Sequence, residues 1–356
     1  MTVLRCSGPL LPDGEPTDLY VVGGRVTYER HTGAESAGDG WIVPGLVDAH
    51  CHLGLDDFGA VGEEETEQQA IEDRDAGALL IRDAGSAADT RWVQSREDLP
   101  RLIRCGRHIG RTKRYIRNYA HEIEPDELSA YAAREARAGD GWIKLVGDWI
   151  DRDRGDLTPS FPAEAFAAAI DAAHAEGAKV TAHCFGAEVL PGLIEAGIDC
   201  LEHGTGLSED LVDAMVAGGT ALVPTIMQLD AFPEHAAAGG RRFPEYGATM
   251  TDLYERMPAT IMAAYDAGVP IYAGSDGGGI SRHGNLAGEV AALHRIGIPA
   301  ADALGAASWR AREWLEHPGL EEGAPADFVV YASNPLDDLS VLRSPAVVVL
   351  RGHVVT

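Results

Sequence analysis

Eight short apolar runs recur along the chain, and most of them are hydrophobic at nearly every position. Strands that are covered on both faces have this continuous apolar character, whereas strands with one face in solvent alternate between apolar and polar residues. We therefore predict eight buried strands. They occupy residues 41–53, 78–85, 101–109, 142–149, 178–186, 200–206, 221–227 and 270–279.

Alanine-rich stretches with helical spacing lie between these runs, for example at 162–176, 187–196, 208–217 and 250–267. Glycine, a common stop signal for helices, follows several of them. Alternation of strands and helices predicts a parallel sheet with right-handed crossovers. Eight such units favour an α/β fold of the (β/α)8 TIM-barrel type over the alternative, an open doubly wound sheet.

The two ends of the chain do not continue this alternation. Residues 1–44 contain short β-like pieces separated by Gly-rich turns, and residues 320–356 contain two more such pieces. We expect the two ends to pair into one small flanking β-sandwich domain that is discontinuous in sequence. The barrel itself is expected at residues 45–319.

Side chains that can bind metal ions fall at the C-terminal ends of five predicted strands. Residues two apart in a strand point to the same side, so the two histidines of the His-Cys-His sequence face together. In a TIM barrel the C-terminal strand ends meet at the face that carries the chemistry. Each residue has a structural explanation when taken alone, but the joint pattern favours a metal centre. The set is His50, His52, Lys144, His183, His203 and Asp276.

Lysine is rare in this chain, which contains only Lys113, Lys144 and Lys179. Lys144 nevertheless lies inside an apolar run. A buried lysine readily shifts its pKa and becomes neutral, whereas an arginine stays charged. A neutral amine beside two cations can react with carbon dioxide. The resulting carbamate is an anion with two oxygens, which suits a bridge between metal ions.

The segments PGLVDAHCH, WIKLVGD, TAHCFG, LEHGTG and AGSDGG together resemble the amidohydrolase superfamily, and more narrowly its imidazolonepropionase-like and prolidase-like branch. The resemblance implies two divalent metal ions, for which zinc is the expected identity. His50, His52 and Asp276 would bind the more buried ion, and His183 and His203 the second. A carboxylated Lys144 and a hydroxide would bridge them.

This resemblance implies a hydrolase of a carbon–nitrogen bond. Two metal ions can share one hydroxide, which attacks the carbonyl carbon, and can polarise the carbonyl. The ion held by His183 and His203 is expected to stabilise the oxyanion, which makes His203 a catalytic candidate. Asp276 is expected to act as general base and then as general acid. The expected substrate is an N-acyl amino acid, a dipeptide-like compound or a cyclic amide.

Other functions remain open from the sequence. Glu202 precedes His203, as in mononuclear metal-dependent deaminases, although those usually lack a strand lysine. Hydrolases of ureas, carbamates or phosphotriesters use the same kind of metal centre. A non-catalytic scaffold on the same barrel is the least favoured alternative, because such relatives typically lose ligands, whereas all six are present here.

Five further residues are candidates for contacts with substrate: His283, Phe185, Tyr119, His121 and Arg242. Related dipeptidases often carry tyrosine at the position of Phe185, which has no hydroxyl to donate. This difference speaks against a simple Xaa-Pro dipeptidase. Residues 227–246 lack a clear helical period at first and are long enough to form a lid over the site.

Composition limits the classes of partner. A formal net charge of −27 repels nucleic acid and anionic membranes, and no apolar stretch is long enough to span a bilayer. The five cysteines are an odd number, and several fall inside predicted strands, which fits reduced thiols and a cytoplasmic location. We expect a small-molecule substrate, and the sequence leaves open whether the chain forms a homo-oligomer.

Overall fold

The first long apolar run is divided between two sheets in the computed structural model, which describes residues 3–279 and 281–356. It was predicted as one strand, but β5 (Trp41–Pro44) pairs with the terminal strands and β6 (Leu46–Cys51) with the central ones. Gly45 lies between them, and a Cβ atom there would be 2.7 Å from Leu79 Cδ1 and 2.8 Å from Arg312 Nη2. A larger residue would therefore not fit where the chain passes from one sheet to the other.

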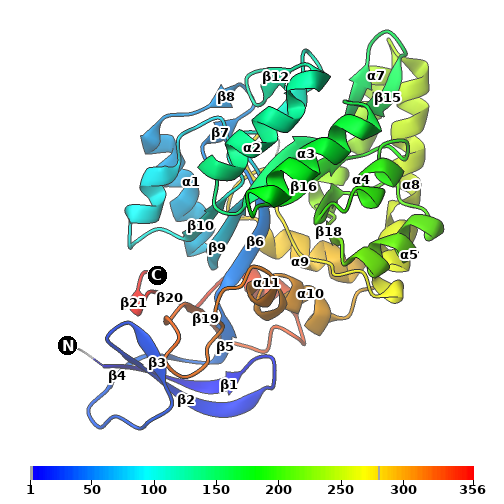
Figure 1. Cartoon of the computed structure of the whole chain (residues 1–356). Helices are drawn as coiled ribbons and strands as arrows, with labels where there is room; N and C mark the ends of the chain where they lie inside the picture. The colour runs from blue at the N-terminus through cyan, green and yellow to red at the C-terminus, as the bar shows by residue number, and fades with distance from the viewer. Residues whose placement is uncertain (1–2, 280) are drawn as a thin grey trace.

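Parallel strands form the centre of the molecule in two hydrogen-bonded sheets (Figure 1). Their orders are β10-β9-β6 and β12-β11-β13-β16-β17-β18. Residues 270–277 join the two, since Ile271 pairs with Leu222 of β18 and Gly277 pairs with Cys51 of β6. The central strands are β6, β9 (Ala78–Asp83), β10 (Arg101–Arg104), β11 (Ile109–Arg111), β12 (His121–Ile123), β13 (Trp142–Val146), β16 (Lys179–Cys184), β17 (Cys200–His203) and β18 (Ala221–Val223).

Helices cover the outside of these strands (Figure 1). The helices expected at 162–176, 187–196 and 208–217 correspond to α3, α4 and α5, whose bounds lie within three residues of the expectation. The helices are α1 (Glu63–Asp75), α2 (Leu128–Ala138), α3 (Ala163–Ala175), α4 (Leu190–Glu195), α5 (Glu209–Gly218), α6 (Ile226–Leu229), α7 (Phe232–Gly240), α8 (Pro244–Ala267), α9 (Leu286–Arg295), α10 (Ala300–Ala306) and α11 (Trp309–Trp314).

Both ends of the chain enter one eight-stranded sheet at the side of the central strands (Figure 1). Its order is β21-β20-β19-β5-β1-β2-β3, and β4 pairs with β1. Arg101 of β10 forms a 2.6 Å ion pair with Asp327 and thereby ties this sheet to the central strands. The strands are β1 (Leu4–Leu10), β2 (Glu15–Val22), β3 (Arg25–Thr27), β4 (Glu35–Asp39), β5, β19 (Phe328–Tyr331), β20 (Val347–Leu350) and β21 (His353–Val354).

Several predicted strands are shorter than expected, and the run at 270–279 forms only isolated bridges, at Ile271 and Gly277, in place of the predicted strand. The run at 101–109 is interrupted between β10 and β11, the run at 142–149 ends as β13 and continues into the hairpin of β14 (Asp148–Asp151) and β15 (Asp156–Pro159), and 221–227 turns into α6 after β18. Another small hairpin consists of β7 (Leu55–Asp56) and β8 (Gly59–Ala60). Short 3₁₀ helices occupy Arg91–Ser95, Pro125–Glu127 and Leu339–Arg343.

Residues 227–246, which lack a clear helical period in the sequence, are largely helical and belong to α6, α7 and the start of α8. Proline lies in the first turn of both α7 and α8, where its missing N–H costs nothing. Gly240 and Gly247 let the two helices approach, since a Cβ on Gly247 would be 2.8 Å from Gly240 Cα. These small residues weakened the helical pattern in the sequence, but they are what allows the close packing.

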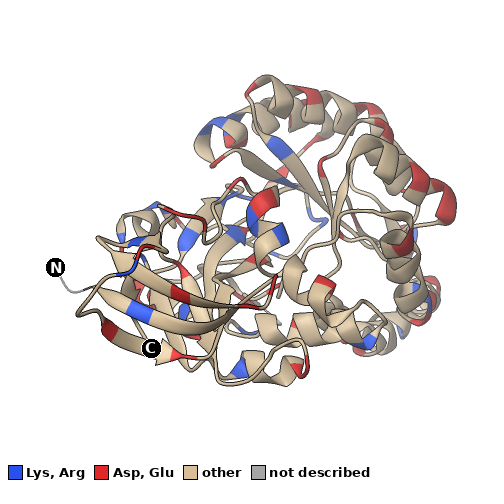
Figure 2. Cartoon of the chain, turned by 90° about the horizontal axis from the view of Figure 1, so that it is seen from below, with Lys and Arg blue, Asp and Glu red and all other residues tan. Residues whose placement is uncertain are grey.

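Acidic side chains are spread over the surface helices (Figure 2), in line with 56 Asp and Glu against 29 Lys and Arg in the sequence. None of the helices in the described part of the chain is long and apolar enough to cross a membrane. All five cysteines are buried and free.

Candidate metal centre

Strained backbone conformations mark the ends of three central segments. His203, Thr225 and Asp276 have φ angles of 67°, 48° and 52°, in the left-handed region that residues other than glycine rarely adopt. Each such residue costs on the order of 1–3 kcal/mol and persists only where surrounding contacts enforce it. All three lie at one end of the central strands, which directs attention to the side chains that they place there.

Residues 275 and 276 are tied directly to β6. Asp48 Oδ1 accepts hydrogen bonds from the backbone N–H of His50 (3.1 Å) and from that of Ser275 (3.0 Å). The N–H of Asp276 donates to the carbonyl oxygen of His50 at 2.8 Å. Gly274 makes this approach possible, because a Cβ there would be 2.7 Å from His50 N. The two segments are thus held in a fixed register, although they are more than 220 residues apart in sequence.

Three donor atoms converge between these segments. His50 Nε2 lies 3.1 Å from His52 Nε2 and 3.2 Å from Asp276 Oδ1, and His52 Nε2 lies 3.1 Å from the same carboxylate oxygen. Ligand atoms on one divalent ion have separations of this order when the metal–ligand bonds are about 2.0–2.2 Å. His50, His52 and Asp276 therefore form a site whose spacing suits a metal ion.

The Nδ1 atoms of His50 and His52 form hydrogen bonds that fix the orientation of the two rings. His52 Nδ1 lies 2.8 Å from the carbonyl oxygen of Gly85, and because a carbonyl can only accept, Nδ1 carries the hydrogen. His50 Nδ1 lies 2.7 Å from Glu202 Oε2 and donates to that carboxylate. In both rings the lone pair of Nε2 is left facing the site, as ligation of a metal requires.

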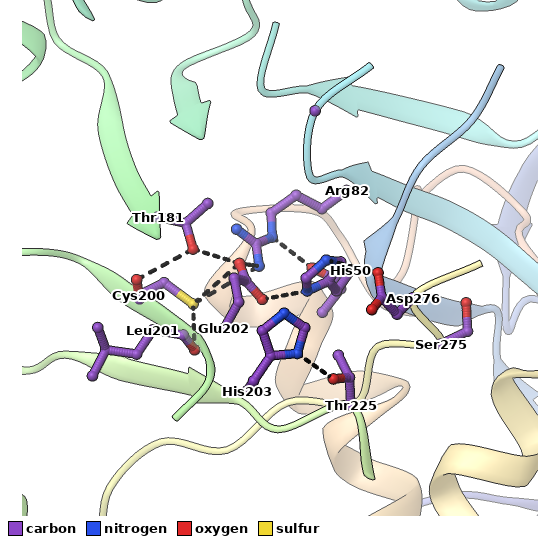
Figure 3. Close-up of polar contacts among 12 residues, drawn as sticks. His50, Arg82, Thr181, Cys200, Leu201, Glu202, His203, Thr225, Ser275 and Asp276 are labelled. Atoms are coloured by element: carbon purple, nitrogen blue, oxygen red, sulfur yellow. Dashed lines mark hydrogen bonds and ion pairs between the residues drawn. The ribbon is translucent and has the colours of Figure 1, made fainter. Parts of the chain in front are cut away.

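Glu202 is the centre of a buried polar cluster behind His50 (Figure 3). Its Oε1 forms a 2.6 Å ion pair with Arg82 and accepts a hydrogen bond from Thr181. Arg82 also donates from Nε to the carbonyl oxygen of Ala49 at 2.7 Å. Burial alone would raise the pKa of Glu202, but Arg82 and His50 hold that pKa well below its usual range. Glu202 is therefore an anion that orients His50 and does not line the cavity.

His183, His203 and Lys144 complete the group. The rings of His183 and His203 lie 4.7 Å apart between centroids, and His203 lies 5.3 Å from His50. His203 Nδ1 is 2.6 Å from the hydroxyl of Thr225. Within residues 3–279 and 281–356, Lys144 Nζ and His183 Nε2 are buried polar atoms without a hydrogen-bond partner. Such atoms are costly in a folded protein, and a bound cation or a modification of the lysine would satisfy them.

The pKa shifts of most of the six residues favour their metal-binding forms, whereas the pKa of His50 is raised, because burial and Lys144, which lower it, are outweighed by Glu202 and Asp276. Burial lowers the pKa of Lys144, lowers that of His183 well below its ordinary value and lowers that of His203 to about 3. Burial would raise the pKa of Asp276, but His50 and His52 together hold it well below its usual range. Neutral imidazoles, a lysine that readily becomes neutral and an ionised carboxylate are the species that would hold divalent ions.

The predicted substrate contacts are only partly at this site. Phe185 and Tyr119 line the cavity above the histidines. His121 instead binds Glu135 at 3.0 Å, and Arg242 is exposed on the surface with its guanidinium over the Phe243 ring. His283 lies beside the site, where its Nδ1 is 2.9 Å from Asp73 Oδ2 and 3.5 Å from Cys51 Sγ. Among these five residues, the cavity is therefore lined by Phe185 and Tyr119.

Sequence reasoning did not single out several residues that line or support the site. Tyr115, Trp149 and Gln228 line the cavity, and Thr225 supports His203, yet no spacing signal marks them. His108 is buried with its ring 4.9 Å from that of His52. At the end of β9, Arg82 donates to the carbonyl oxygen of Ala49 and the N–H of Gly85 donates to Asp83 Oδ1, and these contacts order this strand end.

Several known proteins are similar to this chain in sequence. An uncharacterized protein of Mycobacterium tuberculosis (strain ATCC 25618 / H37Rv) is 54% identical over 352 residues, which cover 98% of this chain and 95% of the relative. Ochratoxinase of Aspergillus niger is 26% identical over 231 residues, 63% of this chain and 47% of the relative.

Solved structures have the same fold over nearly the whole chain. A Xaa-Pro dipeptidase crystallised with bound methionine gives a TM-score of 0.84 at 23% identity, covering 99% of both chains. Aspergillus niger ochratoxinase gives 0.80 at 21% identity, covering 99% of this chain and 96% of that one. The model of the amidohydrolase family matches residues 41–355. The chain therefore belongs to the amidohydrolase family and is a hydrolase that acts on carbon–nitrogen bonds.

Proposed function

We propose that this protein is a binuclear metal-dependent hydrolase of an amide-type bond. The observation that carries the proposal is the convergence of His50, His52 and Asp276 on one point beside the unpartnered atoms of Lys144 and His183. His50, His52 and Asp276 would hold one ion, His183 and His203 the other, and a carbamate on Lys144 would reach both. Zinc suits this set of imidazole and carboxylate ligands.

Two divalent ions bound here would supply an activated hydroxide and polarise the scissile carbonyl. The chain's own residues supply orientation and proton transfer. Asp276 is ionised and lines the cavity, so its carboxylate can take a proton on the substrate side of the site and return it to the leaving nitrogen. His203 contributes as a ligand whose ring is held by Thr225.

The surroundings of Glu202 favour this hydrolase over a mononuclear deaminase. A glutamate that exchanges protons with a substrate must reach the cavity. Here both carboxylate oxygens are engaged, by Arg82 and Thr181 on one side and by His50 on the other, and the side chain is fully buried. The lysine on β13 has no role in the deaminase alternative, whereas a binuclear site uses it. A non-catalytic scaffold would not require the donor set that is preserved here.

The substrate is proposed to be an N-acyl amino acid, a dipeptide-like compound or a cyclic amide. The Xaa-Pro dipeptidase of the same fold supports this class by analogy, because its name indicates cleavage of a dipeptide. Hydrolysis of ureas or carbamates would use the same residues and is the second candidate, since phenylurea hydrolase B has the same fold with a TM-score of 0.73.

We also infer that the central strands close into an eight-stranded barrel over residues 45–319, flanked by a β-sandwich domain from 1–44 and 320–356. The pairing of residues 270–277 with both β18 and β6 supports closure. Phe328↔Pro44 and the neighbouring pairs between β19 and β5 support a domain made from both termini.

Metal analysis and one substitution test the proposal. We expect purified protein to bind about two divalent ions per chain, the number that a binuclear site requires. Asp276→Asn should retain a folded chain and lose hydrolysis of N-acyl amino acid, dipeptide and lactam libraries. A single ion per chain in the active wild-type enzyme would favour the deaminase, and full activity of Asp276→Asn with both ions bound would exclude the proposed proton transfer.

A further inference from the structure

The cavity above the site has a volume of about 300 Å³ and walls that are largely apolar. Its aromatic and aliphatic side chains come from segments that follow several central strands. The apolar lining consists of Tyr115, Ile116, Tyr119, Trp149, Ile150, Leu157, Phe185, Tyr246 and Met250. A cavity of this kind binds ligands mainly through apolar contact, with few polar groups to orient them.

Three aromatic rings pack directly on the proposed second metal site. Phe185 lies 4.3 Å from His183 and 4.8 Å from His203 between ring centroids. Trp149 lies 5.3 Å from His183, and Tyr115 lies 5.6 Å from it. Trp149 and Phe185 are nearly parallel, at 27° and 6.5 Å. An apolar group bound between these rings would sit beside the reacting bond.

The charged residues of the lining are acidic. Asp57 and Asp276 line the cavity, whereas no lysine or arginine does so in the described ranges 3–279 and 281–356. The nearby Arg114 is engaged elsewhere, with Asp151 at 3.1 Å and with the carbonyl oxygen of Trp149 at 3.1 Å. A carboxylate bound at the wall of this cavity would find no lysine or arginine of the kind that normally offsets desolvation, and His235 is the one lining histidine outside the proposed metal ligands in the described part of the chain.

From this lining we propose a substrate class that rests on the proposed function and restricts it to compounds without a free carboxylate: a neutral amide that carries an aromatic or bulky apolar acyl group. N-acyl amino acids and dipeptides with a free carboxylate would then be poorer substrates than their neutral amides. Water adds to the carbonyl carbon, the carbon–nitrogen bond breaks, and the nitrogen leaves with a proton. The products are a carboxylic acid and an amine. The rings of Tyr115, Trp149 and Phe185 hold the acyl group, and the absence of lysine and arginine from the described lining selects against anionic substrates.

A matched pair of compounds tests the charge preference. N-benzoyl-phenylalanine amide and N-benzoyl-phenylalanine contain the same benzoyl–nitrogen bond. They differ only in the C-terminal group, which is a neutral carboxamide in the first and a carboxylate in the second. We expect kcat/KM of the metal-loaded enzyme to be at least ~10-fold higher for the carboxamide, because only the acid must be desolvated as an anion. Equal or better turnover of the acid would overturn the inference while leaving the proposed hydrolase intact.

Binding gives a readout that does not depend on turnover. If neither compound is hydrolysed, the proposed function fails for this class, and calorimetric titration of the metal-loaded protein with both compounds still tests the charge preference. Tighter binding of the carboxamide supports the inference, and tighter or equal binding of the acid contradicts it.

Substitutions in the cavity lining test where the substrate binds. Ile150→Arg places a cation on the cavity wall and should move the preference toward the acid, and Ile116→Arg offers the same test if the first variant does not fold.

Trp149→Ala should reduce kcat/KM for the benzoyl compound more than for its acetyl analogue. Trp92→Ala is the control, because Trp92 is half-buried in a 3₁₀ helix and does not line the cavity. Equal losses for benzoyl and acetyl compounds in Trp149→Ala would remove the aromatic contact from the proposal.

Discussion

Glu202 Oε2 lies 2.7 Å from His50 Nδ1, and this contact fixes the hydrogen of the imidazole on the side away from the site. The same carboxylate is held by Arg82 on its other oxygen. The ion pair of Glu202 and Arg82 thus lies behind His50, a proposed metal ligand. Glu202 orients the imidazole ring and increases its basicity.

Removal of this charge should weaken metal binding. We expect Glu202→Gln to lower the affinity for zinc by about 10–100-fold, the usual effect of losing such a supporting contact. Competition with a chromogenic chelator measures the change. Glu195→Gln, on the exposed face of α4, should bind zinc as the wild type does. Unchanged affinity in Glu202→Gln would mean that the orientation of His50 does not depend on the carboxylate.

Lys144 is expected to determine the number of bound ions. Lys144→Ala should bind about one ion per chain in place of two, because the bridging anion is lost. Lys179→Ala is the matched control, since Lys179 lies on the neighbouring strand β16 and pairs only loosely with Glu316 at 3.4 Å. Elemental analysis after gel filtration gives the stoichiometry, and two ions in the Lys144 variant would rule out the carbamate.

Close packing of residues 274–276 on β6 should be sensitive to one methyl group. Gly274→Ala would place Cβ within 2.7 Å of His50 N, so the segment must shift and carry Asp276 with it. We expect a loss of stability of about 1–3 kcal/mol, typical of overpacking, together with weaker metal binding. Gly218→Ala has no such close contact and should unfold at the wild-type denaturant concentration or above it.

Glu289 gives the stability a pH dependence. It is fully buried and accepts hydrogen bonds from Ile226 N (2.8 Å) and Met227 N (3.0 Å), and burial raises its pKa from 4.5 to about 8. Between these values the folded chain retains a proton that the unfolded chain releases, so the contribution of Glu289 to stability is complete below about pH 4.5 and is lost as the pH rises toward 8.

The variant Glu289→Gln cannot ionise and isolates this effect. The free energy of unfolding of the wild type should fall relative to the variant by a few kcal/mol between about pH 5 and about pH 9. Urea denaturation of both proteins at matched metal loading provides the comparison. A constant difference across this range would show that Glu289 has the same pKa in both states.

Much of the fold follows from local patterns. Continuous apolar runs and alanine-rich stretches mark most of the central strands and helices, because backbone geometry fixes the periods of both. The helices within 227–246 were not predicted from the sequence, because glycine and proline weaken a helical pattern locally, and only the packing of α7 against α8 shows that they are accommodated.

The sequence by itself determined which donor types are available and that His50 and His52 share a side of one strand, since that depends only on the two-residue repeat of a strand. Tertiary structure decided which residues meet. Asp48 accepts a hydrogen bond from Ser275, which is 227 residues away in sequence, and Glu202 orients His50 over a separation of 152 residues. The aromatic residues of the cavity lining also come from separate segments of the chain. Such contacts depend on how the loops and strand ends pack in three dimensions, and no local pattern of apolar and polar residues encodes them.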